Sequence, residues 1–458
     1  MLKNEIINKL RKIVGSENVL NSKITMTTYA YDSSPFLGKP GAVVFPTTTE
    51  MIVEIIKLAN KYNIPVTPRG AGTCLCGGAV GVEDAIIISL AKFNRILEIN
   101  AVNRTALVEP GVINKELQLA AEPYGLMYAP DPASQNVSTI GGNIAENAGG
   151  IRGVKYGCTK EHVLGLEVVL PSGEVITTGG LNSQVDPEID LTYIFCGAEG
   201  TLGLVTKALL SLTPINSDTK TMTAVFTTLE DAGACVSEII AKGVIPTTME
   251  ILDNTVIKAV EDYAKLGLPK DAAALILLEV DGFPAETKAM VETIIQAFKN
   301  NNSINYKIAK DEKERQDLWK ARRAVNGALG KLKPSNVVHD IVVPRDRLAV
   351  MLKKVAKIAE KYDIIIGQVA HAGDGNLHPT LYYDHRIPKE ADVIEEACDE
   401  IIKETINEGG TISGEHGIGL EKLKYMPLAF SQPSLDYMKK IKESFDPENR
   451  TNPGILLP

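Results

Sequence analysis

One stretch of the chain carries too few bulky side chains to build a hydrophobic core. Residues 129–153, "APDPASQNVSTIGGNIAENAGGIRG", contain two Gly-Gly pairs and three Asn within 25 residues. Glycine permits positive φ and a close approach of the backbone to a neighbouring group. We therefore expect this stretch to use its backbone for contact with another group rather than to supply core.

Two further segments are also loops rich in glycine. "PRGAGTCLCGGA" (68–79) comes after an apolar strand, and "CGAEGTLGLVTKALLSLTP" (196–214) opens one. Successive N–H groups of such loops can converge on an anion. The first loop lacks the Gly-Lys-Ser/Thr of a Walker loop, and Leu75 replaces the last glycine of Gly-x-Gly-x-x-Gly. A Rossmann site for NAD is thus disfavoured, whereas a diphosphate cradle of another kind and a simple turn both stay open.

Charge and hydropathy exclude several classes of partner. The net charge is −9 and the pI is near 5.4, which argues against nucleic acid or an anionic membrane as the main partner. No apolar run reaches the roughly 18 residues of a membrane-spanning helix. The N-terminal segment "MLKNEIINKLRKIVG" lacks the apolar core and cleavage site of a signal peptide. A cytoplasmic location is the resulting expectation.

The cysteines offer no thiolate cluster of the usual spacing. The six are Cys74, Cys76, Cys158, Cys196, Cys235 and Cys398, with no Cys-x-x-Cys among them. Iron–sulfur clusters and structural zinc sites of thiolate type therefore lack ligands, and a disulfide framework is unexpected in a cytosolic chain. The pair in the first glycine loop is explained by packing, since small side chains suffice there.

The order of periodic segments predicts an α+β protein. An amphipathic helix is expected at 50–63 and a buried strand at 85–90, in a region that alternates helix and strand. Two strand–helix units after Pro214 predict an antiparallel sheet. We expect boundaries that give residues 1–215, divided near 100, then 216–415, and a last segment 416–458.

Two of the six histidines flank an Asp-Gly pair in "HAGDGNLH" (371–378). Asp-Gly favours a two-residue type I′ hairpin turn. With Asp374-Gly375 as the turn, His371 and His378 stand directly opposite each other, with Cβ atoms about 4.5–5.5 Å apart. Both imidazoles can then reach one ion. The alternative is a hairpin whose histidines satisfy local hydrogen bonds, and a third ligand would decide between the two.

Together these motifs resemble a known flavoprotein family. "PRGAGT", "PDPASQNVSTIGGNIAENAGG" and "GAEGTLGLVTKALLSLTP" resemble the FAD-binding module of the vanillyl-alcohol oxidase superfamily. "HAGDGNLHP" and "TISGEHGIGLEK" resemble its branch of D-lactate and D-2-hydroxyglutarate dehydrogenases and glycolate oxidase flavoprotein subunits. The resemblance implies a two-subdomain FAD-binding module over 1–215, a cap domain over 216–415, and a C-terminal segment 416–458 that returns to the FAD module.

The same resemblance assigns the cofactor residues. The FAD diphosphate is expected on the first loop and the flavin on the second, with one residue further along and one in the returning segment. The residues are Arg69, Gly70, Ala71, Gly72, Thr73, Gly77, Gly78, Pro130, Asp131, Thr139, Gly141, Gly142, Asn143, Asn147, Gly150, Val205 and Asn452. Some relatives bind FAD covalently through a histidine in the first loop, and because this loop has none, the FAD is expected to be non-covalent.

The resemblance also supplies the third metal ligand. Glu415 in "GEHGIG" would complete a two-histidine, one-carboxylate set with His371 and His378, which suits Zn²⁺, Fe²⁺ or Mn²⁺. His416 would be the proton acceptor. Arg322 in "LWKARRAVNG" would grip the substrate carboxylate, with Arg323 as an adjacent competitor.

The expected activity is FAD-dependent oxidation of a 2-hydroxy acid to a 2-oxo acid. D-lactate is favoured as the substrate, then glycolate. The reason is that neither Lys331 nor Lys333 aligns securely with a site for the second carboxylate of D-2-hydroxyglutarate. D-2-hydroxyglutarate nevertheless stays open as a substrate. A flavin-dependent transferase of the same fold, a flavin subunit that only relays electrons and a redox-silent metalloprotein stay open as functions. A transferase of the ether-lipid type would carry a histidine run, which is absent here.

Electrons must leave through another molecule, since the chain has neither iron–sulfur cysteines nor a Rossmann site. Quinone, a cytochrome, an iron–sulfur partner and an electron-transferring flavoprotein all stay open as acceptors. The resemblance includes dehydrogenase subunits of electron-bifurcating lactate dehydrogenase complexes. Whether the chain forms a homodimer is also left open.

Overall fold

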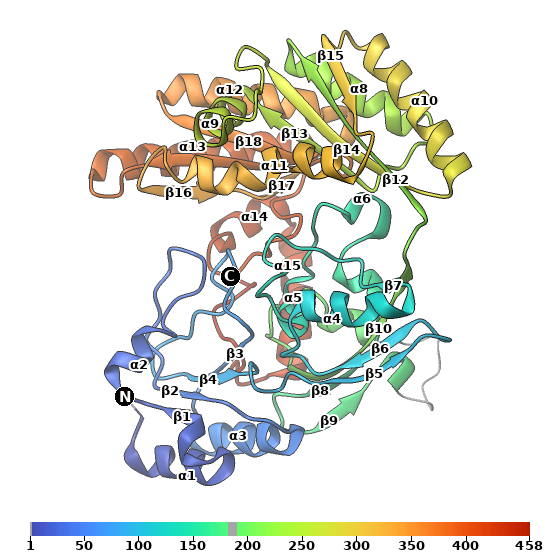
Figure 1. The fold of residues 1–458 in the computed structure, drawn as a ribbon. Helices are drawn as coiled ribbons and strands as arrows, with labels where there is room; N and C mark the ends of the chain where they lie inside the picture. Colours follow the sequence, from blue (N-terminus) through green and yellow to red (C-terminus); the bar gives the residue numbers. More distant parts are fainter. Residues whose placement is uncertain (1, 182–189) are drawn as a thin grey trace. The chain divides into compact units, whose positions relative to one another are not determined.

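The structure is a computed structural model that describes residues 2–181 and 190–458. The chain forms two compact units (Figure 1). The first consists of Met1–Gly150, Gly157–Ile215 and Glu415–Pro458, and the second of Ile151–Tyr156 and Asn216–Gly414. The chain therefore enters the second unit twice and ends in the first.

The first unit begins with a small, mainly parallel sheet. Its strands, in the order β1-β2-β4-β3, are β1 (Val19–Leu20), β2 (Ala42–Val44), β4 (Ile86–Ser89) and β3 (Val66–Arg69). Strands β2, β4 and β3 are parallel, and β1 is antiparallel to β2. Helices α1 (Asn4–Val14) and α3 (Thr49–Tyr62) share one hydrophobic core with this sheet, and the short α2 (Lys23–Thr27) follows β1.

Helix α3 shows why the sequence folds this way locally. Thr48 caps its start by accepting a hydrogen bond from Met51 N at 3.3 Å, and Asn63 ends it in the left-handed conformation, with φ of 53°. The buried positions are Ile52, Ile55, Ile56 and Ala59, which is the helical spacing. The helix predicted at 50–63 and the strand predicted at 85–90 are confirmed.

A second, antiparallel sheet completes the first unit. Its order is β5 (Ile96–Asn100), β6 (Thr105–Val108), β10 (Leu204–Ser211), β8 (Val163–Val169) and β9 (Val175–Thr177). Its core also contains residues of α4 (Asn114–Ala121) and α5 (Ile140–Glu146). The remaining elements of the unit are β7 (Leu126–Met127), β11 (Thr213–Pro214), α7 (Thr192–Phe195), α14 (Met426–Ala429) and α15 (Gln432–Phe445).

The second unit is built on one antiparallel sheet, as predicted. Its path is β15 (Asn305–Ile308), β12 (Asp218–Phe226), β14 (Ala274–Gly282), β13 (Thr248–Asp253), β18 (Ile365–His371), β19 (Asn376–Tyr383) and β16 (Ser335–Val338), and β17 (Ile341–Val342) also pairs with β19. Together with the first unit, this sheet confirms the predicted α+β class.

Helices cover both faces of this sheet (Figure 1). One face packs against α9 (Asn254–Ala264) and α11 (Glu312–Leu329) in a shared core. On the other face lie α8 (Leu229–Ala241), α10 (Pro284–Asn300), α12 (Leu348–Tyr362) and α13 (Pro388–Asn407), and α6 (Gly153–Tyr156) contacts β13. Because side chains alternate along a strand, Leu252 and Val369 in the first core put Glu250 and His371 on the same face as α11.

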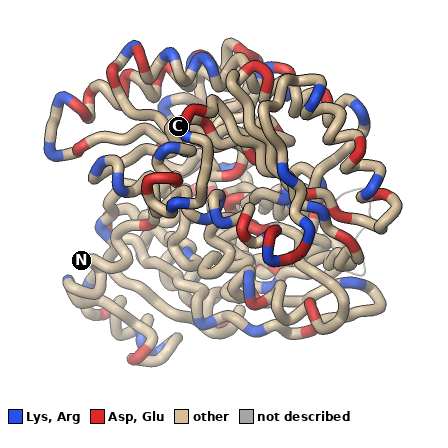
Figure 2. The backbone as a smooth tube through the Cα atoms, turned by 45° about the horizontal axis from the view of Figure 1, so that its top comes forward, with Lys and Arg blue, Asp and Glu red and all other residues tan. Residues whose placement is uncertain are grey.

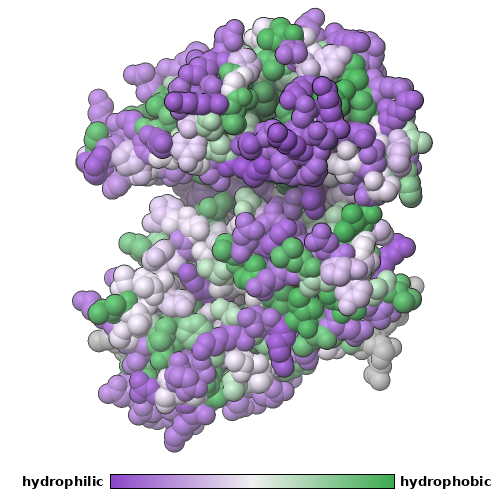
Figure 3. Space-filling model, viewed as in Figure 1, coloured by the Kyte–Doolittle hydropathy of each residue, from purple (hydrophilic) through white to green (hydrophobic). Residues whose placement is uncertain are grey.

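Charges of both signs are interspersed along the backbone of each unit (Figure 2). Lys354 and Lys361 on α12, for example, pair with Glu404 and Glu400 on α13, each at 2.5 Å. Ion pairs near the surface, such as these, add little to stability because water and salt screen them. The face drawn in Figure 3 mixes hydrophilic and hydrophobic residues on each unit. Among the helices of residues 2–181 and 190–458, none is long and apolar enough to cross a membrane.

Candidate active site

The first glycine loop begins where β3 ends, and the side chain of Arg69 braces it. Arg69 is buried, and its Nη1 donates a hydrogen bond to Ala79 O at 3.2 Å, so the arginine joins the two ends of the loop. Burial lowers the pKa of Arg69, although nearby Asp32 opposes the effect. A Cβ placed on Gly72 would lie 2.1 Å from Arg69 Nη2, and Gly72 has φ of +72°. Position 72 therefore favours glycine on both counts.

Consecutive backbone N–H groups in this loop are free to bind an anion. Within the described part of the chain, those of Ala71, Gly72 and Thr73 donate no hydrogen bond. Positive φ within such a run lets successive N–H groups point into one concavity. This arrangement fits the diphosphate of FAD, which the sequence placed on the same residues.

The second glycine loop packs directly on the first. Thr139 caps α5 by accepting a hydrogen bond from Gly142 N at 3.2 Å. A Cβ on Gly70 would lie 2.2 Å from Thr139 Oγ1, and one on Gly141 would lie 2.6 Å from Pro110 Cβ. The first loop approaches Thr139 of the second so closely only because Gly70 carries no side chain, and Gly141 lets the second loop pack against Pro110 in the same way.

The returning C-terminal segment is attached to the same region. Asn452 is buried, and its Nδ2 donates to Gly78 O at 2.9 Å and to Glu199 O at 2.8 Å. Its backbone N–H donates to Val66 O at 2.8 Å, beside β3. Asn452 thus connects the first glycine loop with the loop that precedes β10.

The other predicted cofactor residues have identifiable partners within the first unit. Asn143 donates to Asn114 Oδ1 at 3.0 Å, and Asn114 in turn donates to Pro130 O at 3.1 Å. A Cβ on Gly150 would lie 2.5 Å from the backbone oxygen of Asp131.

Asn147 and Val205 are two more of the predicted cofactor residues. Asn147 ends α5 with φ of 53° and accepts from Lys160 N at 2.9 Å. Val205 packs against the core of the second sheet. Contact of these two residues with FAD, like that of the other predicted cofactor residues, stays a prediction.

The hairpin of the second unit corrects the predicted turn. Strand register pairs His371 with Asn376 and His378 with Val369, so a four-residue loop, 372–375, joins the strands. The prediction that the two histidines stand directly opposite each other across a two-residue turn is wrong. Of the two predicted turn residues, only Gly375 has positive φ (+74°), whereas type I′ requires it at both.

Contacts from outside the hairpin explain the longer loop. Arg345 Nε donates to Gly373 O at 2.6 Å, and Val343 N donates to Gly375 O at 3.0 Å. These hydrogen bonds use the carbonyl groups of Gly373 and Gly375, which a two-residue turn would orient differently.

The two histidines nevertheless meet. A shift of the register by two residues keeps both side chains on the same face of the sheet, as diagonal neighbours. Their ring centroids lie 4.9 Å apart with the rings nearly perpendicular, and one nitrogen of each ring lies within 4.8 Å of one of the other. Both side chains are buried. The second unit alone therefore presents two imidazoles that can share an ion.

Glu250 is a site residue that the sequence analysis missed. It lies on β13 directly across from His371 and is fully buried. Its Oε1 is 2.5 Å from His371 Nδ1, and its Oε2 accepts from Arg322 Nε at 2.6 Å. Burial raises the pKa of Glu250, but the charges of His371 and Arg322 outweigh it and hold the pKa at about 2. One ionised carboxylate thus links the predicted metal ligand to the predicted substrate arginine.

The structure also separates Arg322 from its neighbour in sequence. Arg322 faces Glu250, and its side chain is 19% exposed. Arg323 instead donates to the backbone oxygen of Gln316 in its own helix at 2.7 Å. Since Glu250 occupies Nε of Arg322, the two terminal nitrogens are the ones left for a substrate.

The chain leading to the predicted third ligand is fixed within the second unit. Asp340 is buried, and its Oδ2 accepts from Ser413 Oγ at 2.8 Å and from Gly414 N at 2.9 Å. Gly414 immediately precedes Glu415. The position at which the chain leaves the second unit is therefore set by a buried carboxylate.

Glu415 and His416 open the returning segment of the first unit. His416 Nε2 lies 3.9 Å from Glu415 Oε1. A Cβ on Gly149 would lie 2.6 Å from Glu415 Oε2, so Glu415 lies over the second glycine loop. Gly417, the next residue, has φ of +87°, so the chain turns directly after this pair.

Glu199 holds the returning segment directly after Gly417. It accepts hydrogen bonds from Ile418 N at 2.6 Å and from Gly419 N at 2.8 Å. Burial raises the pKa of Glu199 to about 7, against the effect of these two N–H groups. Both predicted residues, Glu415 and His416, are thus placed beside the loops expected to hold the flavin.

Comparison with known proteins identifies the family. A domain described as "FAD linked oxidases, C-terminal domain" matches residues 215–456, and one described as "FAD binding domain" matches 40–179. The glycolate oxidase subunit GlcD of Bacillus subtilis is 43% identical, covering 100% of this chain and 97% of its own length. The D-lactate dehydrogenase of Anaerostipes hadrus is 32% identical, covering 99% and 97%.

A solved structure shows the same fold at lower sequence similarity. The 4-ethylphenol oxidase from Gulosibacter chungangensis superposes with a TM-score of 0.81 at 20% identity, over 99% of this chain and 97% of that one. Two glycine loops in contact, the first with free N–H groups, on a fold of vanillyl-alcohol oxidase type, define an FAD-binding oxidoreductase. The chain belongs to the family of FAD-linked oxidases.

Non-covalent attachment of the cofactor can be tested directly. Acid precipitation is expected to release all of the flavin into the supernatant as FAD, since residues 68–79 contain no histidine for a covalent link. The measurement is flavin absorbance in supernatant and pellet, with chromatography to identify FAD. Yellow colour remaining in the pellet would contradict this expectation.

The Gly72→Val variant is expected to fold without colour. A β-branched residue at φ of +72° is strained, and its Cβ would overlap the Arg69 guanidinium, so the free N–H groups lose their arrangement. Gly243→Val is a matched control, because Gly243 also has positive φ but its Cβ would meet nothing within 4 Å. Flavin content per protein, with circular dichroism as the folding check, distinguishes the two. A yellow Gly72→Val protein would remove this loop from the cofactor site.

Proposed function

We propose that the chain oxidises a small D-2-hydroxy acid, D-lactate before glycolate, to the corresponding 2-oxo acid. The observation that carries the proposal is the chain of contacts Arg322–Glu250–His371, at 2.6 and 2.5 Å. The two carboxylate oxygens of buried Glu250 contact different groups. Oε2 contacts the guanidinium of Arg322, which suits a substrate carboxylate, and Oε1 contacts His371, a candidate metal ligand. The names of two relatives, a glycolate oxidase subunit and a D-lactate dehydrogenase, support a substrate with adjacent carboxylate and hydroxyl groups.

We propose further that His371, His378 and Glu415 hold a divalent metal, either Zn²⁺, Fe²⁺ or Mn²⁺. The contact of His371 Nδ1 with Glu250 supports this, because such a contact directs Nε2 of the ring toward a metal and fixes its tautomer. When bound, the ion would lower the pKa of the substrate hydroxyl. Glu415 is assigned because it follows Gly414, whose backbone is anchored beside the hairpin by Asp340.

The roles of the other residues follow from their chemistry. The terminal nitrogens of Arg322 would bind the substrate carboxylate, and Glu250 would keep the guanidinium oriented. His416 would take the proton of the substrate hydroxyl. Bound FAD would supply the acceptor, flavin N5, for the hydride from C2. One proton and one hydride leave the substrate, which balances its conversion to a 2-oxo acid.

A short substrate is favoured by the two lysines near Arg322 in sequence. Lys331 Nζ lies 4.5 Å from the ring centroid of Tyr263, and Lys333 Nζ pairs with Glu390 at 3.2 Å. Both ammonium groups therefore have partners already, which leaves neither of them as a ready site for the second carboxylate of D-2-hydroxyglutarate.

We also propose that the first unit binds FAD, that the second supplies substrate contacts, and that a separate molecule accepts the electrons. One relative is named as a subunit, which favours a protein acceptor such as an iron–sulfur subunit or an electron-transferring flavoprotein, with quinone as the second candidate.

Anaerobic mixing with candidate substrates tests the proposal. D-lactate and glycolate are expected to bleach the flavin absorbance rapidly, L-lactate not at all, and D-2-hydroxyglutarate slowly. Rapid bleaching by D-2-hydroxyglutarate alone would overturn the preference for a short substrate. No bleaching by any of the four would overturn the proposed function.

A further inference from the structure

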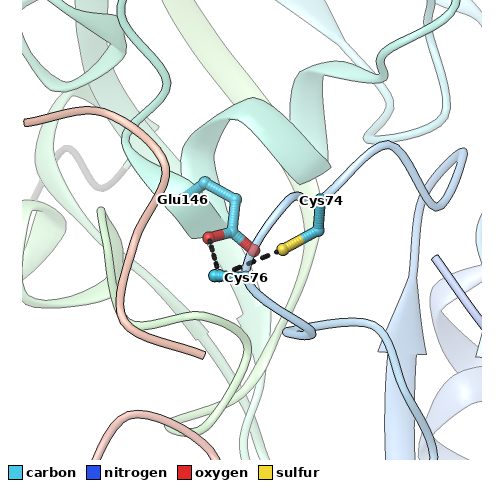
Figure 4. A group of neighbouring side chains, drawn as sticks. All are labelled: Cys74, Cys76 and Glu146. Carbon is cyan, nitrogen blue, oxygen red and sulfur yellow. Dashed lines mark hydrogen bonds between the residues drawn. The ribbon is translucent and has the colours of Figure 1, made fainter. Parts of the chain in front are cut away.

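Two cysteines and a glutamate form a cluster that the proposed reaction does not use. Cys74 and Cys76 come from the first glycine loop, and Glu146 is the last residue of α5 (Figure 4). The sulfur atoms of the two cysteines lie 3.2 Å apart, and Cys76 Sγ donates to Glu146 Oε2 at 3.8 Å. The three side chains therefore form one continuous hydrogen-bonded chain, with the two thiols already in contact.

The two thiols have different surroundings. Cys76 is fully buried, whereas Cys74 is half-buried and its sulfur also accepts from Gly78 N at 3.3 Å. The hydrogen bond between the sulfurs lowers the pKa of Cys74, and the same contact, together with burial, raises the pKa of Cys76. Thiolate is the nucleophilic form of cysteine. The thiol of half-buried Cys74 is thus the better nucleophile, and the thiol of buried Cys76 keeps its proton.

Glu146 is a carboxylate without a counter-charge. No Lys, Arg or His within the described residues forms an ion pair with it, and its hydrogen-bond partner is the weak S–H donor of Cys76. Withdrawal from water raises the pKa of Glu146, and Cys74 adds to the rise. The raised pKa makes the ionised form of Glu146 a stronger base, next to the thiol of Cys76.

We propose that Cys74 and Cys76 form a reversible disulfide, in which Cys74 attacks, Cys76 resolves and Glu146 accepts the proton of Cys76. With a low-molecular-weight disulfide as oxidant, the Cys74 thiolate displaces one small thiolate and forms a mixed disulfide. Cys76 then gives its proton to Glu146 and attacks Cys74 Sγ, which releases the second small thiolate. The protein loses two electrons and the small disulfide gains them.

The geometry permits this bond with little movement. A disulfide has an S–S distance of about 2.05 Å, so the sulfurs, now 3.2 Å apart, need to approach by about 1 Å. The bond would close across Leu75 alone, in the loop whose free N–H groups precede it at Ala71 to Thr73. Oxidation would therefore stiffen the cofactor loop, and this inference does not depend on which substrate the enzyme oxidises.

The test uses the FAD-loaded protein, treated with oxidised glutathione, then blocked with iodoacetamide and digested with trypsin. Peptide 70–92 contains both cysteines and no other. It is expected to lose two hydrogens and escape alkylation, and to regain both alkylation sites after dithiothreitol. Cys196→Ser, which removes another cysteine of the same unit, should behave as the wild type. A peptide that is still fully alkylated after excess oxidised glutathione would overturn the proposal.

Variants separate the three roles. Cys76→Ser should accumulate glutathione on Cys74, and Cys74→Ser should accumulate none on Cys76. Glu146→Gln should form the mixed disulfide at the normal rate and resolve it at least tenfold more slowly. Equal labelling of Cys74→Ser and Cys76→Ser would overturn the assignment of nucleophile. If Cys74→Ser but not Cys196→Ser lowers the zinc content of the purified protein, the cluster is a metal site and the disulfide proposal is wrong.

Discussion

Replacement of His416 by Ala is expected to slow flavin reduction by on the order of 10²–10⁴-fold, the usual contribution of a positioned general base. FAD should remain bound, because the loops that hold it are supported by Arg69, Thr139 and Asn452 rather than by His416. Metal should also remain, since His416 is assigned as a base and not as a ligand. The measurement is stopped-flow reduction by saturating D-lactate, with FAD and metal content determined on the same sample.

The Glu415→Ala variant, at the adjacent residue, distinguishes loss of a metal ligand from loss of a base. It is expected to lose both metal and activity, because a carboxylate ligand is removed. The two side chains lie within 3.9 Å of each other, so general damage to this segment would affect both variants alike. If His416→Ala loses the metal and Glu415→Ala keeps it, ligand and base have been exchanged in the assignment. Flavin reduction at the wild-type rate in His416→Ala would remove the histidine from the chemistry.

Much of the fold was predictable because its signals are local. Thr48 and Asn63 mark the ends of α3 by capping, and the apolar spacing between them specifies the buried face. The glycine loops were equally visible, since a stretch with so few bulky side chains cannot pack a core. Positions such as Gly70 and Gly72 then proved to be sites where a Cβ would overlap neighbouring atoms.

The turn between His371 and His378 was mispredicted because distant residues decide it. The preference of Asp-Gly for type I′ is intrinsic to two residues, but hydrogen bonds with Arg345 and Val343 stabilise a longer loop. The two histidines still lie on the same face of the sheet, because a register shift of two residues preserves the alternation of side chains.

Glu250 was missed for a related reason. Its partners lie 121 and 72 residues away in sequence, on other elements. One signal was available: Glu250 stands between the apolar residues Met249 and Ile251, and an acidic residue that is buried with such neighbours needs a cation partner nearby. The sequence could have predicted that Glu250 is paired, but the identity of its partners follows only from the strand pairing.

Removal of either predicted histidine ligand is expected to have the largest effect. His371→Ala and His378→Ala should each lose the metal and most of the activity while FAD stays bound in the first unit. His385→Ala is the matched control, since His385 is exposed in the same unit and contacts Ser335 Oγ instead. Metal content by mass spectrometry, flavin absorbance and the rate of flavin reduction are the three measurements.

A graded variant tests whether Glu250 orients the ligand rather than merely filling space. Glu250→Gln preserves the shape but removes the charge shared by His371 and Arg322, so metal affinity should fall by about 10–100-fold, the usual cost of losing an outer-shell partner of a ligating histidine. The KM for D-lactate should rise as well, because Arg322 loses its orienting partner. If both histidines can be replaced without loss of metal or of flavin reduction, then His371 and His378, whose ring centroids lie 4.9 Å apart, have only a structural role. The Arg322–Glu250–His371 contacts would then serve to pair a charged residue of α11 with the sheet.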